Sequence, residues 1–251
     1  MHIRLTRVVK ILLIAFLAVF VIQHTGDQFF GANFVGWLGL VPAGIVNEHR
    51  FWQLFTYPFL HGDVMHLVLN LMMMVFVGGE LESTWGSARF LRFFFVCTVS
   101  AGIFFLLLQL MVWKDFSLQS PMIGASGGIY GLLMAYGLIF GERVLLFMML
   151  FPMKAKHFVW VLAGIEFLSS VFSGRGGLAS AAHLGGMVAG FAYLWSRARL
   201  LVARQQWSDY RVQSQKAQKR RKAKHLKLVI DNRNEPDSEN DDFDNTPKTW
   251  H

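Results

Sequence analysis

Residues 124–140 read GASGGIYGLLMAYGLIF, in which a serine enclosed by glycines opens an apolar segment long enough to enter a bilayer. The hydrocarbon core of a membrane disfavours polar side chains, so those found there commonly have a function. His183 lies near the start of a second apolar segment. His66 and Asn70 lie on a third, four residues apart and therefore on one helical face. Polar side chains at similar depths in three apolar segments indicate hydrolysis inside a membrane.

The composition is typical of an all-α polytopic membrane protein. Of the 251 residues, 54% are hydrophobic and only 16% are charged, against about a quarter in soluble domains. The net charge of +8 lies mostly outside the apolar blocks. It therefore indicates membrane topology and contact with lipid headgroups ahead of binding to nucleic acid. The single cysteine, Cys97, lies in an apolar run, which indicates packing and excludes an intramolecular disulfide.

The pattern of apolar blocks predicts a membrane domain over residues 1–198 and a tail over residues 199–251. Six spans are expected, at residues 8–24, 61–79, 89–113, 124–140, 157–173 and 179–197. The first begins after basic residues but has no small-x-small cleavage site, so it is predicted to be a retained helix rather than a signal peptide. Its run is short, and snorkelling by Lys10 and Gln23 is expected to extend it.

Two apolar stretches are too irregular or too short to span. Residues 26–60 are rich in Gly, Phe and Trp and are predicted to form a compact structure in the membrane interface, where Trp37 and Trp52 are favoured. Residues 145–153 end near Pro152 and are predicted to be an interfacial loop or a helix extension.

Basic residues set the expected orientation, because cytoplasmic loops carry an excess of Lys and Arg. With the N-terminus inside, the segments predicted to be cytoplasmic contain Arg4, Arg7, Lys10, Arg89, Arg92, Arg143, Lys154, Lys156 and the whole tail. The segments predicted to be outside contain only Arg50, Lys114 and Arg175. Both termini are therefore expected in the cytoplasm, with the protein in the cell (inner) membrane. The polar residues His61, His66, Ser126 and His183 are then expected near the outer ends of their helices.

The tail is basic from residue 197 to 227 and acidic from residue 237 to 244. Such a segment cannot bury a core, so it is predicted to be partly helical and partly disordered. Contact with anionic lipid is favoured over nucleic acid, because no aromatic or groove-reading pattern accompanies the charge.

Ser126 and His183 can supply a nucleophile and a base. A serine hydroxyl reacts poorly until a base takes its proton, and neutral imidazole is the usual base. Gly186 and Gly190 share the helix face of His183, in a small-xxx-small pattern that permits close helix approach. The helix of Ser126 is similarly rich in small residues, at Gly124, Gly127, Gly128 and Gly131.

Three groups can stabilise a tetrahedral oxyanion. The backbone N–H of Ser126 lies in the first turn of its helix, where it has no intrahelical acceptor. His66 and Asn70 can each donate a further hydrogen bond from one face of their helix. Tyr130, four residues after Ser126, is expected to pack its ring against His183.

Other readings of these residues are disfavoured. The string Gly-x-Ser-x-Gly also occurs in the nucleophile elbow of soluble hydrolases, but no strand pattern precedes it here. His61, His66 and His183 could ligate a metal, but no His-Glu-x-x-His motif is present, and no acidic residue lies close to them in sequence. No metal or other cofactor is expected.

In combination, these residues resemble the signatures of the rhomboid intramembrane serine proteases, over residues 52–195. Residues 61–70, HGDVMHLVLN, resemble the second-helix signature, with His61, His66 and Asn70. Residues 124–127, GASG, resemble the nucleophile motif, and residues 182–186, AHLGG, with Gly190 resemble the helix of the catalytic histidine. Glu82 resembles the structural glutamate at the cytoplasmic end of the second helix.

The resemblance implies a six-helix bundle with a Ser126–His183 dyad and no third, acidic member. It also implies an oxyanion site made of His66, Asn70 and the Ser126 backbone, in a cavity that opens to the outer face. The implied substrates are single-span membrane proteins, cut near the outer end of their span. One departure is Gln53, which follows Trp52 where the family commonly has Arg, so the tethering of the first loop is expected to differ; Arg50 is a candidate substitute.

Two alternatives stay open. A non-catalytic rhomboid-like protein would bind membrane clients without cutting them, although such proteins usually lack one or more of the four positions present here. A transporter is less favoured, because inverted-repeat symmetry and paired broken helices are absent from the sequence.

Overall fold

The computed structural model describes residues 5–111, 118–147 and 151–233, and the chain separates into two units, Met1–Ser196 and Arg197–His251. The first unit contains every candidate site residue. In the second, the chain is helical as far as Arg233. The acidic stretch at 237–244, together with Arg4 and Lys114, lies outside the described residues, so the predictions made on them stand as predictions.

Most of the described residues lie in helices, and those of the first unit form a bundle. In chain order the elements are α1 (Arg7–Phe30), α2 (Phe34–Leu38), α3 (Pro42–Glu48), α4 (Gln53–Thr56), the 3-10 turn η1 (Tyr57–Phe59), α5 (Val64–Met73), the π-helical segment η2 (Met74–Gly78), α6 (Gly79–Trp85), α7 (Ser87–Met111), α8 (Ser126–Ile139), β1 (Val144–Phe147), β2 (Phe151–Lys154), α9 (Ala155–Phe172) and α10 (Arg175–Arg233).

Among the described residues, five helical stretches are long and apolar enough to cross a membrane. They are α1, the continuous α5–η2–α6 stretch, α7, α9 and the first part of α10. The fourth predicted span, at residues 124–140, contains α8, which has 14 residues, fewer than the roughly 20 that a full crossing needs. The chain therefore has the polytopic helical architecture expected from its sequence, with one short helix among the long ones.

Helix α1 is longer than the predicted first span. Its 24 residues extend about 36 Å, so no snorkelling is needed to reach across a bilayer. Gln23 is buried, and its side chain pairs with the backbone of His61 at 3.1 and 3.2 Å. The expected snorkelling of Gln23 is therefore wrong, because burial allows its amide to satisfy both backbone groups of His61.

Hydrogen bonds to Glu82, on α6, link this helix to the start of α1. Its carboxylate accepts hydrogen bonds from the backbone N–H groups of Val8 and Val9, both at 2.9 Å. The hydroxyls of Thr6 and Ser87 donate to the same carboxylate. These bonds satisfy N–H groups that the first turn of a helix leaves without intrahelical acceptors, and the negative charge suits the helix N-terminus.

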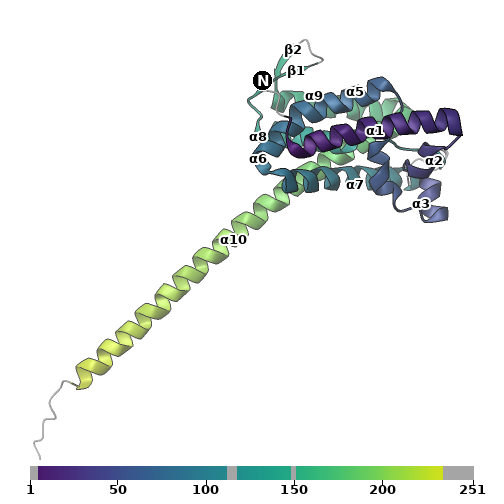
Figure 1. Cartoon of the computed structure of the whole chain (residues 1–251). Coiled ribbons are helices and arrows are strands. Elements are labelled where there is room, and N and C mark those ends of the chain that lie inside the picture. The colour runs from purple at the N-terminus through teal and green to yellow at the C-terminus, as the bar shows by residue number, and fades with distance from the viewer. Residues whose placement is uncertain (1–4, 112–117, 148–150, 234–251) are drawn as a thin grey trace, which may run out of the picture. The chain divides into compact units, whose positions relative to one another are not determined.

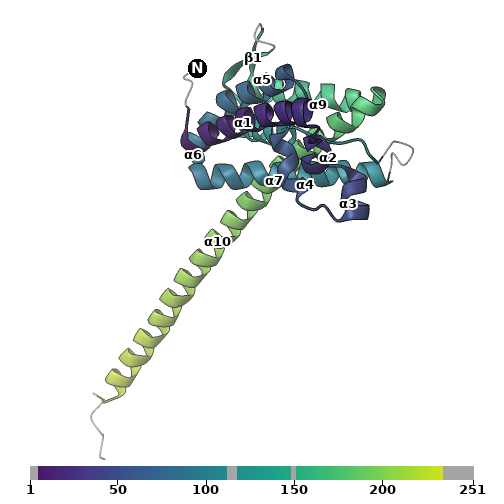
Figure 2. The ribbon, with the colours of Figure 1, turned by 45° about the vertical axis from the view of Figure 1, so that its right-hand side comes forward.

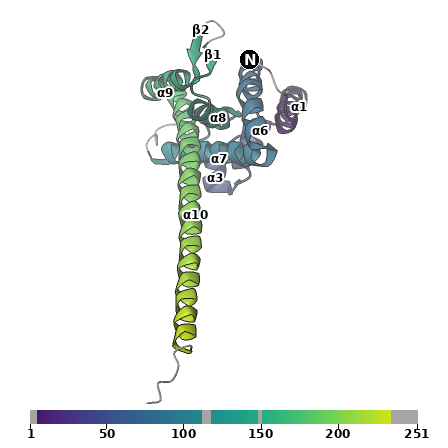
Figure 3. The same ribbon diagram turned by 90° about the vertical axis from the view of Figure 1, so that its left-hand side faces the viewer.

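Helix α8 lies in the middle of the bundle. Viewed end-on, it has α9 on one side and the α5–η2–α6 stretch on the other (Figure 3), and it also contacts α7. A Cβ added at Gly128 would lie 2.2 Å from Thr98 Oγ1, and one added at Gly131 would lie 2.5 Å from Cys97 Cβ, both on α7. The glycines of α8 thus permit a helix spacing that larger residues would prevent.

The short helices between α1 and α5 gather at one end of the bundle, and α6 with the start of α1 lies at the other (Figures 1 and 2). Gln53 is fully buried beneath the short helices. Its side chain accepts from Val41 N at 3.0 Å and donates to the carbonyls of Gly36 and Trp37 at 3.2 and 3.3 Å. Arg50 donates to Gly36 O and lies over the Trp37 ring at 4.3 Å. A neutral amide and a nearby arginine therefore tether this loop.

The stretch at 145–153 is not the loop or helix extension predicted for it. Strands β1 and β2 pair antiparallel, with Val144 opposite Lys154 and Phe147 opposite Phe151. Pro152 is accommodated because β2 is an edge strand of a two-stranded hairpin. Next to the hairpin, hydrogen bonds from Lys154 and Lys156 hold the pKa of the Glu142 carboxyl at about 2.

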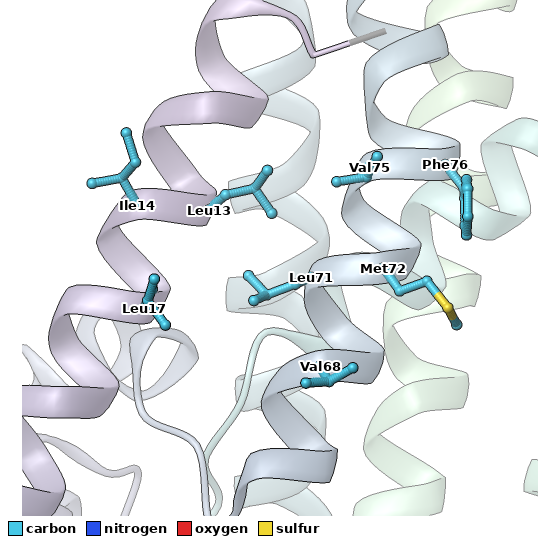
Figure 4. A pocket seen from close by; sticks show the side chains of 8 residues that line it. All are labelled: Leu13, Ile14, Leu17, Val68, Leu71, Met72, Val75 and Phe76. Atoms are coloured by element: carbon cyan, nitrogen blue, oxygen red, sulfur yellow. The ribbon is translucent and has the colours of Figure 1, made fainter. Parts of the chain in front are cut away.

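Apolar side chains also cover the outside of the bundle. A shallow groove between α1 and the α5–η2 stretch is lined by Leu13, Ile14, Leu17, Val68, Leu71, Met72, Val75 and Phe76 (Figure 4). Ile14 keeps 69% of its surface exposed. Exposed apolar side chains of this kind suit contact with lipid, and this groove contains neither Ser126 nor His183.

Candidate active site

Backbone hydrogen bonds to the loop before α5 hold the segment that precedes Ser126. Met122 pairs with Leu40 through two backbone hydrogen bonds of 2.9 Å. Gly124 N then donates to Tyr57 O at 3.0 Å. Gly124 has φ +104°, a conformation that side-chain-bearing residues rarely adopt. The glycine allows the chain to turn sharply into α8, so that Ser126 stands in the first helical turn.

Two glycine pairs bring α8 against α10. A Cβ added at Gly186 would lie 2.0 Å from Gly127 O, and one added at Gly190 would lie 2.9 Å from Gly131 O. The backbones therefore touch, as the small-residue spacing allows. This approach places Ser126 Oγ 2.7 Å from His183 Nε2, the distance of a good hydrogen bond.

His66 and Asn70 lie on α5, next to the segment that carries Gly124. A Cβ added at Gly124 would lie 2.6 Å from His66 Nε2 and 3.8 Å from Asn70 Nδ2. Asp63 caps α5 by accepting from His66 N at 2.9 Å, which fixes the start of this helix. Among the described residues, the buried Nδ2 of Asn70 has no hydrogen-bond partner. A buried amide donor without a partner is costly, so it is available for an acceptor that arrives beside Gly124.

Tyr130 lies one helical turn after Ser126 and covers the face of His183. The two rings are stacked, with centroids 4.4 Å apart and planes 7° from parallel. The Tyr130 hydroxyl donates to a carboxylate oxygen of Glu166. Stacking restricts the tilt of the imidazole, and the hydroxyl links α8 to α9.

Glu166 is a site residue that the sequence reasoning missed. Its Oε1 lies 3.0 Å from His183 Nδ1, on the opposite side of the ring from Ser126. The expectation that no acidic residue joins Ser126 and His183 is therefore wrong in its geometry. Glu166 lies far from both in sequence, and only the packing of α9 against α8 brings it to the site. The available signal was an ionisable residue near the middle of an otherwise apolar predicted span.

The remaining sequence candidates are peripheral. His61 is buried, and its ring meets the rings of His66 and Phe16 edge-on, at centroid distances of 5.1 and 5.5 Å. Glu82, on α6, contacts the start of α1, away from this group. Within residues 5–111, 118–147 and 151–233, no cluster of three or more His, Cys, Asp or Glu residues is arranged to hold a metal ion.

The arrangement has the parts needed for nucleophilic acyl transfer. A hydroxyl is hydrogen-bonded to an imidazole, the imidazole is held on its far side by a carboxylate, and possible oxyanion donors lie next to the hydroxyl. His183 keeps 19% of its side chain exposed, and Ser126 is also partly exposed. Neither residue is fully enclosed by the bundle.

Comparison with known proteins agrees with these features. The Rhomboid domain family matches residues 48–200. Rhomboid-like protein 19 of Arabidopsis thaliana is 30% identical over 194 residues, which cover 74% of this chain and 59% of that protein. Rhomboid-like protein 15 of the same plant is 25% identical over 169 residues, which cover 64% of this chain and 40% of that protein. The chain thus spans about half the length of these two relatives.

Proposed function

The chain belongs to the rhomboid family, and we propose that it is an intramembrane serine endopeptidase with Ser126 as nucleophile and His183 as base. Its apolar helices and its family make it a multi-pass membrane protein. Members of this family act in the membrane on membrane proteins. The observation that carries the proposal is the 2.7 Å contact between Ser126 Oγ and His183 Nε2.

In the proposed first step, Ser126 Oγ attacks the carbonyl carbon of a peptide bond, and its proton passes to His183 Nε2. The tetrahedral intermediate collapses when the C–N bond breaks and His183 returns the proton to the leaving amine. An acyl-serine ester remains. Water, deprotonated by the same imidazole, then hydrolyses this ester and restores the serine hydroxyl. No cofactor or metal ion takes part in these steps.

The oxyanion of each intermediate is proposed to lie beside Gly124. The backbone N–H of Ser126, the side chain of His66 and the unpartnered Nδ2 of Asn70 can all donate toward that position. Each such donor in an acyl-transfer site contributes about 10²- to 10³-fold to the rate. The absence of a side chain at Gly124 leaves room for the oxygen, because any Cβ there would meet the His66 ring.

The proposed substrates are single-span membrane proteins. With both termini in the cytoplasm, the first turn of α8 and the start of α10 lie toward the outer face, so the cut is expected near the outer end of the substrate's span. A helical substrate must unwind locally to expose its carbonyl carbon, which favours substrates with helix-destabilising residues at that level.

A co-expressed single-span reporter tests the proposal. Wild-type protein is expected to give two reporter fragments on a gel, and Ser126→Ala is expected to give none at equal expression. The same reporter should remain bound by Ser126→Ala, because binding does not need the nucleophile. Equal cleavage by both proteins would contradict Ser126 as the nucleophile. Binding without cleavage by the wild type across several reporters would favour a non-catalytic rhomboid-like protein instead.

A further inference from the structure

Glu166 occupies a position that packing alone does not explain. It lies six residues before the end of α9, about 9 Å along the helix axis from that end, in a helix with a strongly apolar composition. An ionisable side chain at such a depth is costly and calls for polar partners. Its side chain is only 10% exposed, so water cannot be its main partner.

The partners of Glu166 are the residues that surround the proposed base. The Tyr130 hydroxyl donates to Oε1, and His183 Nδ1 lies 3.0 Å from the same oxygen. The carboxylate thus joins α8, α9 and α10 at a single point, and that point is the imidazole that contacts Ser126.

The geometry determines which nitrogen of His183 carries its proton. A carboxylate can only accept, so Nδ1 must be the protonated nitrogen that donates to Glu166. The neutral ring then presents the lone pair of Nε2 to the Ser126 hydroxyl, 2.7 Å away. The opposite tautomer would direct an N–H toward Ser126 and could not accept its proton.

We propose that Glu166 is a positioning residue for His183, which makes the catalytic group a Ser126–His183–Glu166 triad rather than a dyad. During the reaction the proton of Ser126 moves to Nε2 and later to the leaving amine, while Glu166 remains a carboxylate throughout. Its negative charge stabilises the imidazolium that exists between these transfers. This inference rests on the proposed protease function.

Kinetics of purified protein with a quenched single-span peptide in detergent test the role of Glu166. Glu166→Gln keeps the size of the side chain and an acceptor for Tyr130, but its neutral amide no longer fixes the tautomer. We expect kcat to fall about 10²- to 10⁴-fold with KM within about threefold of wild type. Glu166→Asp keeps the charge on a shorter side chain and should restore part of the lost kcat.

Glu80→Gln is the matched control. Glu80 is also partly buried and accepts a hydrogen bond from a tyrosine of α8, Tyr136, at 2.6 Å, but it does not contact the site. Its substitution should leave kcat and KM at the wild-type values. A merely structural role for Glu166 would raise KM or reduce the folded fraction of Glu166→Gln, and its kcat per folded molecule would stay unchanged.

The outcomes separate this inference from the proposed function. Cleavage that requires Ser126 and His183 but proceeds with wild-type kcat in Glu166→Gln overturns the triad and leaves the protease intact. Cleavage that persists in Ser126→Ala overturns both. If Glu166→Gln does not give a monodisperse protein, Glu166→Ala carries the test, and an unchanged kcat in that variant overturns the triad.

Discussion

The close approach of α8 and α10 is the structural feature on which the Ser126–His183 contact depends, and Gly186→Ala perturbs it with a single carbon. The added Cβ would lie 2.0 Å from Gly127 O, and real Cβ contacts are essentially never below 3.0 Å. The obstructing atom belongs to the backbone of α8, so it cannot rotate away. The two helices must therefore move apart by about 1 Å or more at this level.

A shift of that size is large compared with the tolerance of the site. If the helices separate by this amount at the catalytic pair, the distance between Ser126 Oγ and His183 Nε2 rises from 2.7 Å to about 3.7 Å, which is beyond hydrogen-bonding range. A misplacement of about 1 Å can cost on the order of 10²-fold in rate. Overpacking at Gly186 should also destabilise the fold by about 1–3 kcal/mol.

The assay compares kcat/KM and the rate of Ser126 labelling by a fluorophosphonate, both normalised to folded protein, with thermal unfolding in the same detergent. Gly164→Ala is the matched control, because a Cβ at that exposed position of α9 meets nothing within 4 Å. It should keep full activity and equal or greater stability. Full activity of Gly186→Ala would refute the reasoning, since it would mean that the helix contact does not set the catalytic distance.

Three further predictions concern the surroundings of the site. Gly124→Ala should abolish cleavage and destabilise the fold by about 1–3 kcal/mol, because φ is +104° and the new Cβ would lie 2.6 Å from the His66 ring; Gly62→Ala, with only an ordinary contact at 3.7 Å, is its control. His61 precedes the span that begins at α5, and burial followed by repulsion from His66 lowers its pKa from 6.5 to about 4. The free energy of unfolding should therefore have its full value above pH 6.5 and fall by about 3 kcal/mol as the pH drops to 4. A series of thermal midpoints measured against pH should show this dependence in the wild type and a flatter one in His61→Leu. Gln53→Leu should lower the thermal midpoint by an amount equivalent to about 1–3 kcal/mol, because it leaves buried backbone groups of the first loop unpaired. Gln53→Glu should lower it too, because a carboxylate keeps the acceptor for Val41 N but places a second acceptor against the carbonyls of Gly36 and Trp37. A wild-type midpoint for either variant would contradict this role.

Local sequence patterns predicted much of the bundle. Apolar length marks the helices, and the small residues at Gly186 and Gly190 indicate the face on which α10 approaches α8, because only residues without side chains allow backbones to touch. The spacing of His66 and Asn70 correctly places both on one face of α5. These features depend on neighbours within one or two helical turns, so the sequence alone carries them.

What the sequence did not predict depends on contacts between distant segments. Glu166 reaches His183 only through the packing of α9, and nothing within four residues of either signals the pair. Gln23 is buried because the backbone of His61 lies beside it, 38 positions later in the chain. The hairpin of β1 and β2 was missed because a short apolar run has no periodicity that separates a strand from a helix extension.

The central claim is that Ser126, activated by His183, cleaves a peptide bond within the membrane. Purified protein reconstituted in liposomes with a single-span reporter tests it most directly, with both fragments identified by mass spectrometry. The proposed mechanism predicts one new pair of termini near the outer end of the reporter's span in the wild type, and intact reporter with Ser126→Ala and with His183→Ala. The same fragments from Ser126→Ala would contradict it.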